Sequence, residues 1–127
     1  MIDPLRLYTE AEKALTNAGA ETSGFRVGAA VVDETGRVFT GCNQENPSIT
    51  QVICAERLAI FKALSEGAKS IKAVLILSEF DEYCYPCGSC RQLIFEYGPD
   101  AQIYITSGRG IMRYSITELL PNPFVRK

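Results

Sequence analysis

The run Ala73-Val74-Leu75-Ile76-Leu77 constrains the fold more than any other part of this sequence. Five consecutive apolar residues leave no polar face on a β-strand, so both faces of such a strand must be covered by other elements. The run is far shorter than the roughly 20 residues that a membrane-spanning helix requires. The sequence therefore predicts a central strand inside a layered α/β fold, with no membrane as a partner.

Segments with helical or β-strand periodicity surround this strand in a regular order. The predicted helices are 4–18, 54–67, 86–97 and a short stretch at 116–120. The predicted strands are 25–32, 37–41, 73–77, 103–105 and 111–114. Turn residues at 33–36 and 108–110 join two pairs of strands, and 43–50 is a polar loop. A strand, a crossover helix and another strand imply parallel pairing, so we expect a three-layer α/β/α sandwich around a mixed five-stranded sheet, in one domain of residues 1–127.

Histidine is absent from all 127 residues. This excludes Ser-His-Asp and Cys-His nucleophilic sites and every imidazole metal site, so any zinc must be held by sulfur or carboxylate. The five cysteines are an odd number with three packed into 84–90, a pattern that favours thiolate ligands kept reduced in a cytoplasmic protein over a disulfide framework. The net charge is −2, and the sequence has no run of like charges. This favours a small-molecule ligand, because the chain lacks the basic patch that nucleic-acid binding requires.

Two of the predicted helices begin with cysteine: Cys54 opens one, and Cys87 and Cys90 lie in the first turn of the other. Helix starts favour thiolates, so three sulfurs could hold one Zn²⁺ and leave a fourth position open, as in catalytic zinc sites. Glu56 could then move protons beside the bound water. Arg57 could offset the excess negative charge of three thiolates through hydrogen bonds to sulfur.

Other interpretations of these cysteines stay open. They could be buried structural cysteines, or a closed zinc site completed by Cys84 or Cys42. The spacing of Cys84, Cys87 and Cys90 also imitates an iron–sulfur run, but the fourth cysteine and the following proline of that pattern are missing. Glu56 alone could simply be a first-turn acid that complements the helix dipole.

The sequence resembles the cytidine deaminase family, in its small, all-cysteine, homotetrameric branch. The resemblance runs from about Phe25 to Phe124 and depends on five motifs in order: Phe25–Ala30, Gly41–Asn46, Ile53–Arg57, Pro86–Gln92 and Glu118–Pro121. It implies a cytidine deaminase-like fold and zinc-dependent hydrolysis of cytidine or deoxycytidine to uridine or deoxyuridine, with release of ammonia.

The resemblance also implies how a nucleoside substrate would be held. Asn43 and Glu45 would hydrogen-bond the ribose, and Phe25 would pack against the nucleoside. The amide of Ala55 and the carboxyl of Glu56 would grip the pyrimidine edge. Phe124 would reach into a neighbouring subunit's pocket and stack on the base. From the residues alone, polar side chains in a loop equally fit local backbone hydrogen bonds, and aromatic rings near element ends equally fit the core.

Departures from the family pattern cluster around the expected pocket. Thr22 and Ile49 replace aromatic residues, and Tyr85 stands where serine is usual before Pro86. They motivate an alternative substrate, a modified cytosine nucleoside of the blasticidin S type. A second alternative, from another class, is a non-catalytic zinc-binding module in which the cysteines only hold the fold.

Overall fold

A computed structural model describes residues 2–80, 82–107 and 109–126 of the chain, so Gly108 of the predicted last turn lies outside the described residues. The helices are α1 (Pro4–Leu15), α2 (Ala55–Ser65), α3 (Gly88–Tyr97) and α4 (Ile116–Leu119). The strands are β1 (Val27–Asp33), β2 (Val38–Cys42), β3 (Ile71–Ser78), β4 (Gln102–Ser107) and β5 (Gly110–Ser115). None of the described helices is long and apolar enough to cross a membrane.

The five strands form one sheet in the order β2-β1-β3-β4-β5. β3 and β4 pair in parallel, with Ala73 opposite Gln102 and Leu77 opposite Thr106, and the other neighbours pair antiparallel. The parallel pair needs a crossover connection, which α3 supplies. The predicted mixed sheet of five strands is therefore confirmed.

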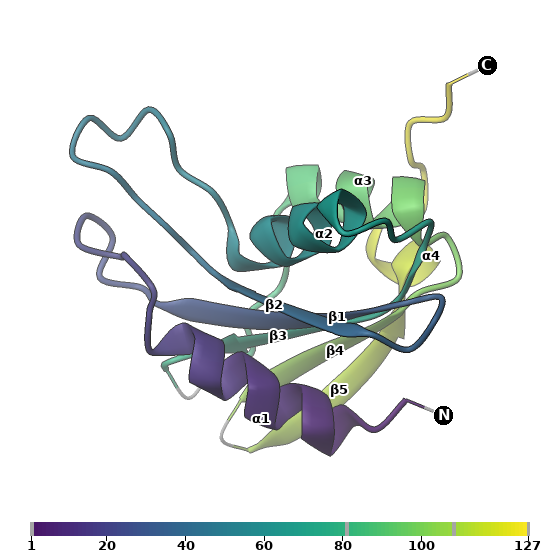
Figure 1. Cartoon of the computed structure of the whole chain (residues 1–127), viewed down its shortest axis with the longest axis horizontal. Coiled ribbons are helices and arrows are strands. Elements are labelled where there is room, and N and C mark those ends of the chain that lie inside the picture. Colours follow the sequence, from purple (N-terminus) through teal and green to yellow (C-terminus); the bar gives the residue numbers. More distant parts are fainter. Residues whose placement is uncertain (1, 81, 108, 127) are drawn as a thin grey trace.

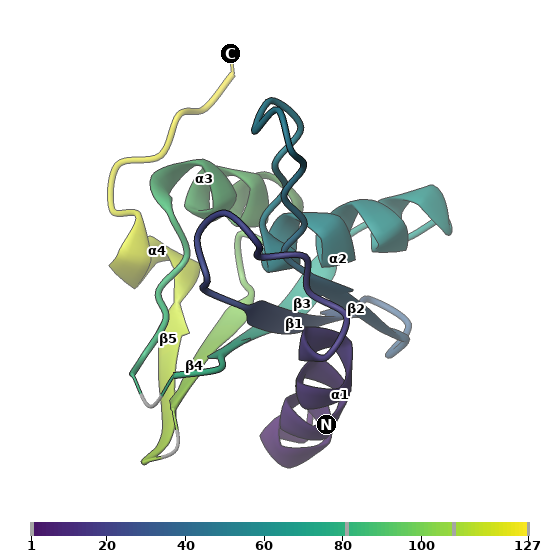
Figure 2. The same cartoon turned by 90° about the vertical axis from the view of Figure 1, so that its left-hand side faces the viewer.

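Helices cover both faces of this sheet, with α1 on one side and α2, α3 and α4 on the other (Figures 1 and 2). The central strand β3 accordingly divides its side chains between two buried clusters. Ala73, Leu75 and Leu77 pack with the α1 residues Leu7, Ala11 and Leu15. Val74 and Ile76 pack with the α2 residues Ala55, Ala59, Ile60 and Ala63. The predicted three-layer sandwich is confirmed, and the apolar run is buried on both faces.

Several helix ends differ from the sequence prediction, and for two of them the structure shows the cause. α1 ends at Leu15 instead of Ala18, because Gly19 leaves the helix to pair with the segment after β2, where its N–H donates to the carbonyl of Asn43. α3 begins at Gly88 instead of Pro86, because Cys87 has the extended backbone of an N-cap residue. Both differences arise from contacts or backbone angles that periodicity does not encode.

α2 lies directly on β2 because the strand carries a glycine at the contact. A Cβ atom on Gly41 would lie only 2.5 Å from the carbonyl oxygen of Ala55 and 2.8 Å from the amide nitrogen of Ala59. No residue larger than glycine fits between these backbones. The first turn of α2 is thus fixed by contact between backbones, which matters because the candidate site begins there.

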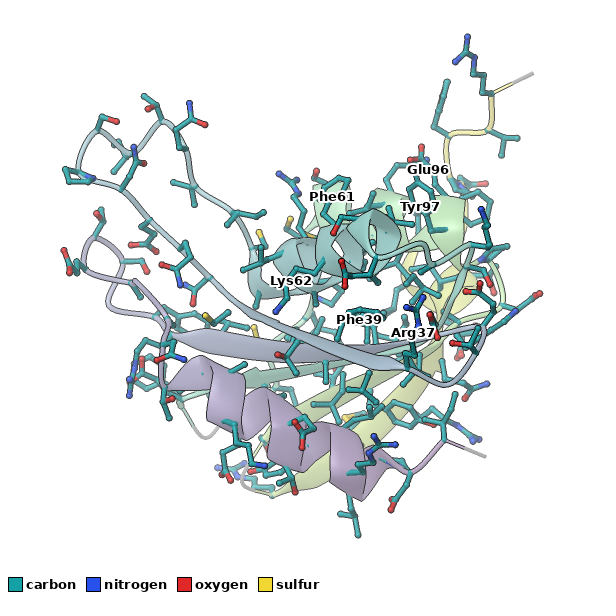
Figure 3. All side chains as sticks on the ribbon, viewed as in Figure 1. Arg37, Phe39, Phe61, Lys62, Glu96 and Tyr97 are labelled. Atoms are coloured by element: carbon teal, nitrogen blue, oxygen red, sulfur yellow. The ribbon has the colours of Figure 1, made fainter. Side chains whose placement is uncertain are left out.

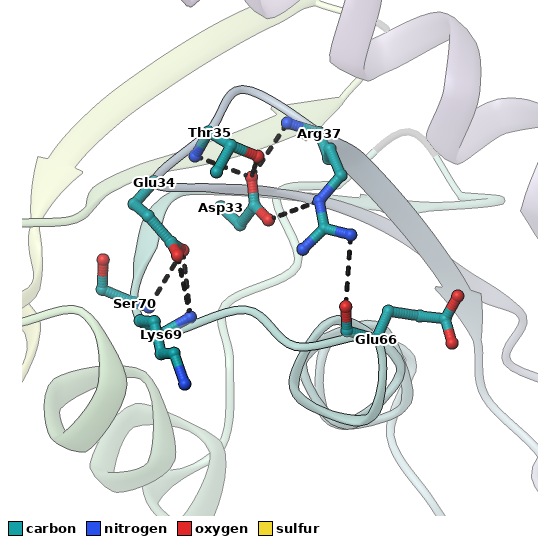
Figure 4. A network of polar contacts seen from close by, with 7 residues as sticks. All are labelled: Asp33, Glu34, Thr35, Arg37, Glu66, Lys69 and Ser70. Atoms are coloured by element: carbon teal, nitrogen blue, oxygen red, sulfur yellow. Dashed lines mark hydrogen bonds and ion pairs between the residues drawn. The ribbon is translucent and has the colours of Figure 1, made fainter.

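A polar network ties the β1–β2 turn to the far end of α2 (Figure 4). Buried Asp33 accepts hydrogen bonds from the backbone and hydroxyl of Thr35 and from the backbone and Nε of Arg37, and Arg37 also donates to the carbonyl of Glu66. Burial alone would raise the pKa of Asp33, but these hydrogen bonds outweigh it and hold the pKa below its usual value. The network anchors α2 at the end opposite its cysteine.

Candidate active site

Three cysteine sulfurs meet where α2 and α3 begin. Cys54 is the N-cap of α2 and Cys87 the N-cap of α3, both with extended backbones, and Cys90 lies in the first turn of α3. Neither cap side chain bonds its own helix, although N-cap side chains usually do. Instead, all three sulfur atoms lie within 4.8 Å of one another. The structure therefore brings together the three residues that the sequence analysis selected as ligands.

The cluster already favours a thiolate. The pKa of Cys54 is lowered to about 6, chiefly by a hydrogen bond from the Cys90 thiol and further by Cys87 and the charge of Arg57. The same hydrogen bond is the largest cause that raises the pKa of Cys90. The two helix starts add partial positive charge at the same place. A cation bound here would therefore meet one sulfur that is readily ionised and two more within reach.

Glu56 lies two residues beyond Cys54 in the first turn of α2 and is only 5% exposed. Burial is the largest cause that raises the pKa of Glu56 to about 7, and the negative charge of Cys54 adds to it. A carboxyl group with such a pKa exchanges protons readily near neutral pH. The raised pKa therefore suits Glu56 to act as a general acid and base. A solvent-exposed acid in the first turn of a helix would not have such a pKa.

The donor set fits a zinc ion with one open position. Thiolate sulfur is a preferred zinc ligand, and catalytic zinc sites use three protein ligands and leave the fourth position to water or substrate. Within the described part of the chain, neither Cys84 nor Cys42 joins the three-sulfur group. Burial also raises the pKa of Cys84 to about 11, which keeps it a thiol. A closed site completed by either of these cysteines does not match this geometry.

A pocket of about 280 Å³ opens beside the cluster, at the small end for ligand pockets. Its lining includes Cys54, Glu56 and Cys87 from the helix starts. Besides Glu56, four of the five further residues that the family resemblance assigned to substrate binding line it: Phe25, Asn43, Glu45 and Ala55. The fifth, Phe124, does not line the pocket of its own chain and is 67% exposed.

Gln44 holds the segment after β2 beside the start of α2. Its backbone pairs with Ile53 through two hydrogen bonds of 3.0 Å, and the segment also pairs with Gly19. The Gln44 side chain bonds the carbonyl of Asn17 and the sulfur of Cys42, away from the pocket. The neighbouring residues Asn43 and Glu45 consequently face the pocket, since side chains alternate along an extended segment.

Asn43 and Glu45 also organise the loop that precedes β1. The Asn43 amide accepts from the N–H of Val27 and donates to the carbonyl of Phe25. The Glu45 carboxylate accepts from the N–H groups of Thr22 and Ser23 and from the Ser23 hydroxyl, and these bonds lower its pKa. Both side chains therefore bond the backbone of a segment 16 to 23 residues earlier in the chain, and not their own loop, while they line the pocket.

Arg57 bridges the two helices that carry the cysteines. Its guanidinium donates to the hydroxyl of Ser89, which stands between Cys87 and Cys90 in the sequence. Its charge also helps to lower the pKa of Cys54. The Arg57 side chain thus bonds a hydroxyl that neighbours the cysteines in the sequence. The prediction from the sequence was hydrogen bonds to sulfur.

Four more pocket-lining residues received no functional role from the sequence, and these are Ser23, Val27, Val52 and Ile53. Cys84 also lines the pocket and was considered there only as a fourth ligand of a closed zinc site or as part of an iron–sulfur spacing. Tyr85, noted there only as a departure from the family pattern, also lines the pocket, and its hydroxyl lies 2.8 Å from that of Tyr114 in β5. The sequence signals for Cys84 and Tyr85 were their nearness to Cys87 and, for Tyr85, the departure from the family pattern. Nothing in the sequence indicated the partnership of Tyr85 with a strand 29 residues away.

A comparison with protein-family models decides the relationship. The model described as "Cytidine and deoxycytidylate deaminase zinc-binding region" matches residues 1–106. The chain belongs to the cytidine and deoxycytidylate deaminase family. A cytidine deaminase of Sporosarcina psychrophila is 38% identical over 99% of this chain and 94% of its own length. A blasticidin-S deaminase of Bacillus cereus is 31% identical over 84% of this chain and 81% of its own length.

The fold of this family member is also found among solved structures. The crystal structure of a cytidine deaminase from Burkholderia pseudomallei superimposes with a TM-score of 0.90 at 37% identity, and the match covers 97% of this chain and all of that one. The resemblance stated from five sequence motifs is therefore confirmed, together with a hydrolytic deaminase activity. Within the described residues of this deaminase, Cys54, Cys87 and Cys90 form a cluster that is compatible with a metal ion.

Proposed function

We propose that the chain is a zinc-dependent enzyme that hydrolyses cytidine and deoxycytidine to uridine and deoxyuridine with release of ammonia. The observation that carries this proposal is the buried carboxyl of Glu56, which has a pKa of about 7. Glu56 lines a pocket together with Cys54 and Cys87, two of the three clustered cysteines. Buried acids with such pKa values gather at catalytic sites. A structural zinc module needs neither a buried carboxyl with a raised pKa nor a pocket beside its ligands.

The proton transfers of this reaction fall to Glu56. Zinc held by Cys54, Cys87 and Cys90 supplies, when bound, a Lewis acid that makes water nucleophilic near neutral pH. Glu56 takes one proton from the attacking water and gives it to N3 of cytosine. It then moves a second proton from the new hydroxyl on C4 to the amine, which leaves as ammonia. One water is consumed and the nucleoside keeps its sugar.

The pocket walls support a nucleoside over a nucleotide. Phe25 offers an apolar face for packing, and Asn43 and Glu45 offer polar groups for sugar hydroxyls. The Ala55 backbone and Glu56 lie where α2 begins and line the same pocket. The acidic side chains Glu45 and Glu56 line the pocket, whereas no lysine or arginine is among its described lining residues. A phosphate group would meet like charge there.

A modified cytosine nucleoside is the second candidate substrate. The observation that favours it is Tyr85, whose ring lines the pocket and is held by the hydroxyl of Tyr114. The similarity of the chain to a blasticidin-S deaminase from Bacillus cereus supports the same candidate. Such a substrate would keep the proton chemistry of Glu56 and change only what the outer walls contact.

A substrate panel tests both candidates. Purified protein with one zinc per chain is expected to remove the cytosine absorbance of cytidine and deoxycytidine at comparable rates, and to leave deoxycytidine monophosphate nearly unchanged because of the acidic walls. Activity confined to methylated cytidines or blasticidin S would replace the first candidate by the second. Zinc-loaded protein that releases ammonia from no member of the panel would contradict both.

We further propose that the active particle is a homotetramer. Large apolar side chains stay exposed on the helical layer, where Phe61 of α2 is 47% exposed and Tyr97 of α3 is 37% exposed (Figure 3). Phe124 is held outside its own pocket by two hydrogen bonds between its backbone and the amide of Gln92. This position suits a ring that enters a neighbouring chain's pocket. Sedimentation is expected to give four 14.0 kDa chains per particle at micromolar concentration, and a monomer would contradict the proposal.

A role in pyrimidine salvage and a cytoplasmic location complete the proposal. All five cysteines are free thiols, and thiolate ligands need a reducing compartment to stay available to a metal. Salvage follows from the proposed products, since uridine and deoxyuridine are free nucleosides.

A further inference from the structure

Four contacts join the segment before β1 to the segment after β3, just outside the pocket. The backbone N–H of Arg26 donates to Oε2 of Glu79 at 2.8 Å, and its Nε donates to the same oxygen at 3.2 Å. The N–H of Glu79 donates back to the carbonyl of Arg26 at 3.0 Å. The rings of Phe25 and Phe80 stack with centroids 5.3 Å apart and planes at 29°.

Only one of these four residues lines the pocket, and it is Phe25. Its backbone is fixed on both sides, because its N–H donates to the Ser23 hydroxyl and its carbonyl accepts from the Asn43 amide. The ring itself has one aromatic neighbour among the described residues, Phe80. The Phe25 side chain also packs against the buried core cluster under α2, so its orientation depends both on the core and on a residue outside the pocket.

Phe80 is placed by the buried end of β3. The hydroxyl of Ser78 donates to the carbonyls of Phe80 and Glu82 at 3.0 and 3.3 Å, and Ser78 is buried. The strand partner of Ser78 is Val27, so the contacts of Arg26 with Glu79 continue the β1–β3 ladder by one step. The ring stack is thus built on sheet geometry, although Phe80 itself lies on the surface.

We propose that Glu79 and Phe80 are positioning residues that hold Phe25 in the orientation that binds the nucleoside. This inference rests on the proposed function. It predicts an effect on substrate binding and none on proton transfer, because Glu56 and the three-sulfur group lie at the starts of α2 and α3, outside this pair of segments. Loss of the contacts should therefore raise KM and leave kcat nearly unchanged.

The two bonds of Glu79 should contribute unequally. The Arg26 side chain is 43% exposed and that of Glu79 is 26% exposed, so water and salt screen their ion pair. The bond from the Arg26 backbone, by contrast, directly fixes the residue next to Phe25. Arg26→Met removes only the ion pair and is expected to change KM by less than about twofold, whereas Glu79→Ala removes both bonds.

Steady-state kinetics on cytidine test this. Glu79→Ala and Phe80→Ala are each expected to raise KM about tenfold, with kcat within about twofold and one zinc per chain retained. Glu82→Ala is the matched control, because Glu82 is an exposed acid in the same segment whose side chain has no partner among the described residues. An unchanged KM in folded Glu79→Ala and Phe80→Ala protein would overturn the proposal, as would a loss confined to kcat.

A readout without substrate separates this proposal from the proposed function. In protein labelled with 4-fluorophenylalanine, the ¹⁹F resonance of Phe25, assigned through Phe25→Leu, is expected to shift in Glu79→Ala and Phe80→Leu but not in Glu82→Ala. The milder Phe80→Leu replacement serves if the alanine variant does not fold. An unmoved resonance overturns the positioning role even if the enzyme is active. If the wild-type chain deaminates nothing, the proposed function fails and the ¹⁹F result still decides whether Phe25 is held in this way.

Discussion

Glu56→Gln is expected to lower kcat for cytidine by about 10³-fold while one zinc per chain stays bound. Glutamine keeps the size of the side chain and its ability to hydrogen-bond in the buried first turn of α2, but it cannot carry a proton. Both transfers assigned to Glu56, to N3 and to the leaving amine, would then lack a carrier. The measurement is ammonia release at saturating cytidine, with zinc counted by mass spectrometry on the same sample.

Glu66→Gln is the matched control for this variant. Glu66 caps the other end of the same helix through its backbone, and its carbonyl accepts from Arg37. Its side chain is exposed and makes no hydrogen bond among the described residues. Its replacement removes the same charge from α2 and should leave kcat within about twofold. Unchanged ammonia release in zinc-loaded Glu56→Gln would assign the site to a structural zinc module and reject the catalytic role.

Cys87→Ser is expected to remove zinc and activity together and to lower the melting temperature by about 15 °C. Cys87 is exposed, so the substitution leaves no cavity in the core. Serine is also a better helix N-cap than cysteine, so the free start of α3 should improve. A loss of stability would consequently report the lost metal and not a damaged helix. Zinc content and thermal melting, each with and without a chelator, measure the effect.

Cys42→Ser provides the comparison for this change. Cys42 is buried next to Gln44 and does not belong to the three-sulfur group, so its variant should keep one zinc per chain and its activity. Chelation of zinc from the wild-type protein should lower its melting temperature to that of Cys87→Ser. Added zinc should then restore the original melting temperature of the wild type, but should not raise that of Cys87→Ser. A Cys87→Ser protein that still holds stoichiometric zinc and deaminates cytidine would show that the ligand set is wrong.

The order of the elements could be predicted because each has a local signal. The apolar run at 73–77 defined the buried strand, and helical spacing defined α2 and α3. The end of α1 could not be predicted, because it depends on the bond from Gly19 to Asn43, which joins segments far apart in the sequence. Periodicity describes the face that an element buries, whereas its last residue depends on partners elsewhere in the chain.

The candidate site shows the same division. Cys54, Glu56, Cys87 and Cys90 fall within two short motifs at helix starts, so their meeting could be predicted from spacing and helix polarity. The partners that shape the rest of the pocket are distant in sequence, as Tyr85 is from Tyr114 and Phe25 from Phe80. A motif identifies the residues proposed to perform the chemistry, whereas the pocket walls depend on strand register and loop conformation.

The backbone contact between Gly41 and the start of α2 has a consequence for evolution and engineering. This contact and the cysteine-capped helices fix the candidate metal ligands and Glu56 on rigid elements. Loops supply other parts of the pocket wall, through Ser23, Phe25, Glu45, Val52, Cys84 and Tyr85. Insertions and substitutions in loops are tolerated far better than in such packed elements. A combinatorial library confined to these loops should therefore explore new nucleosides without losing the reaction, whereas Gly41 should remain invariant in every active clone.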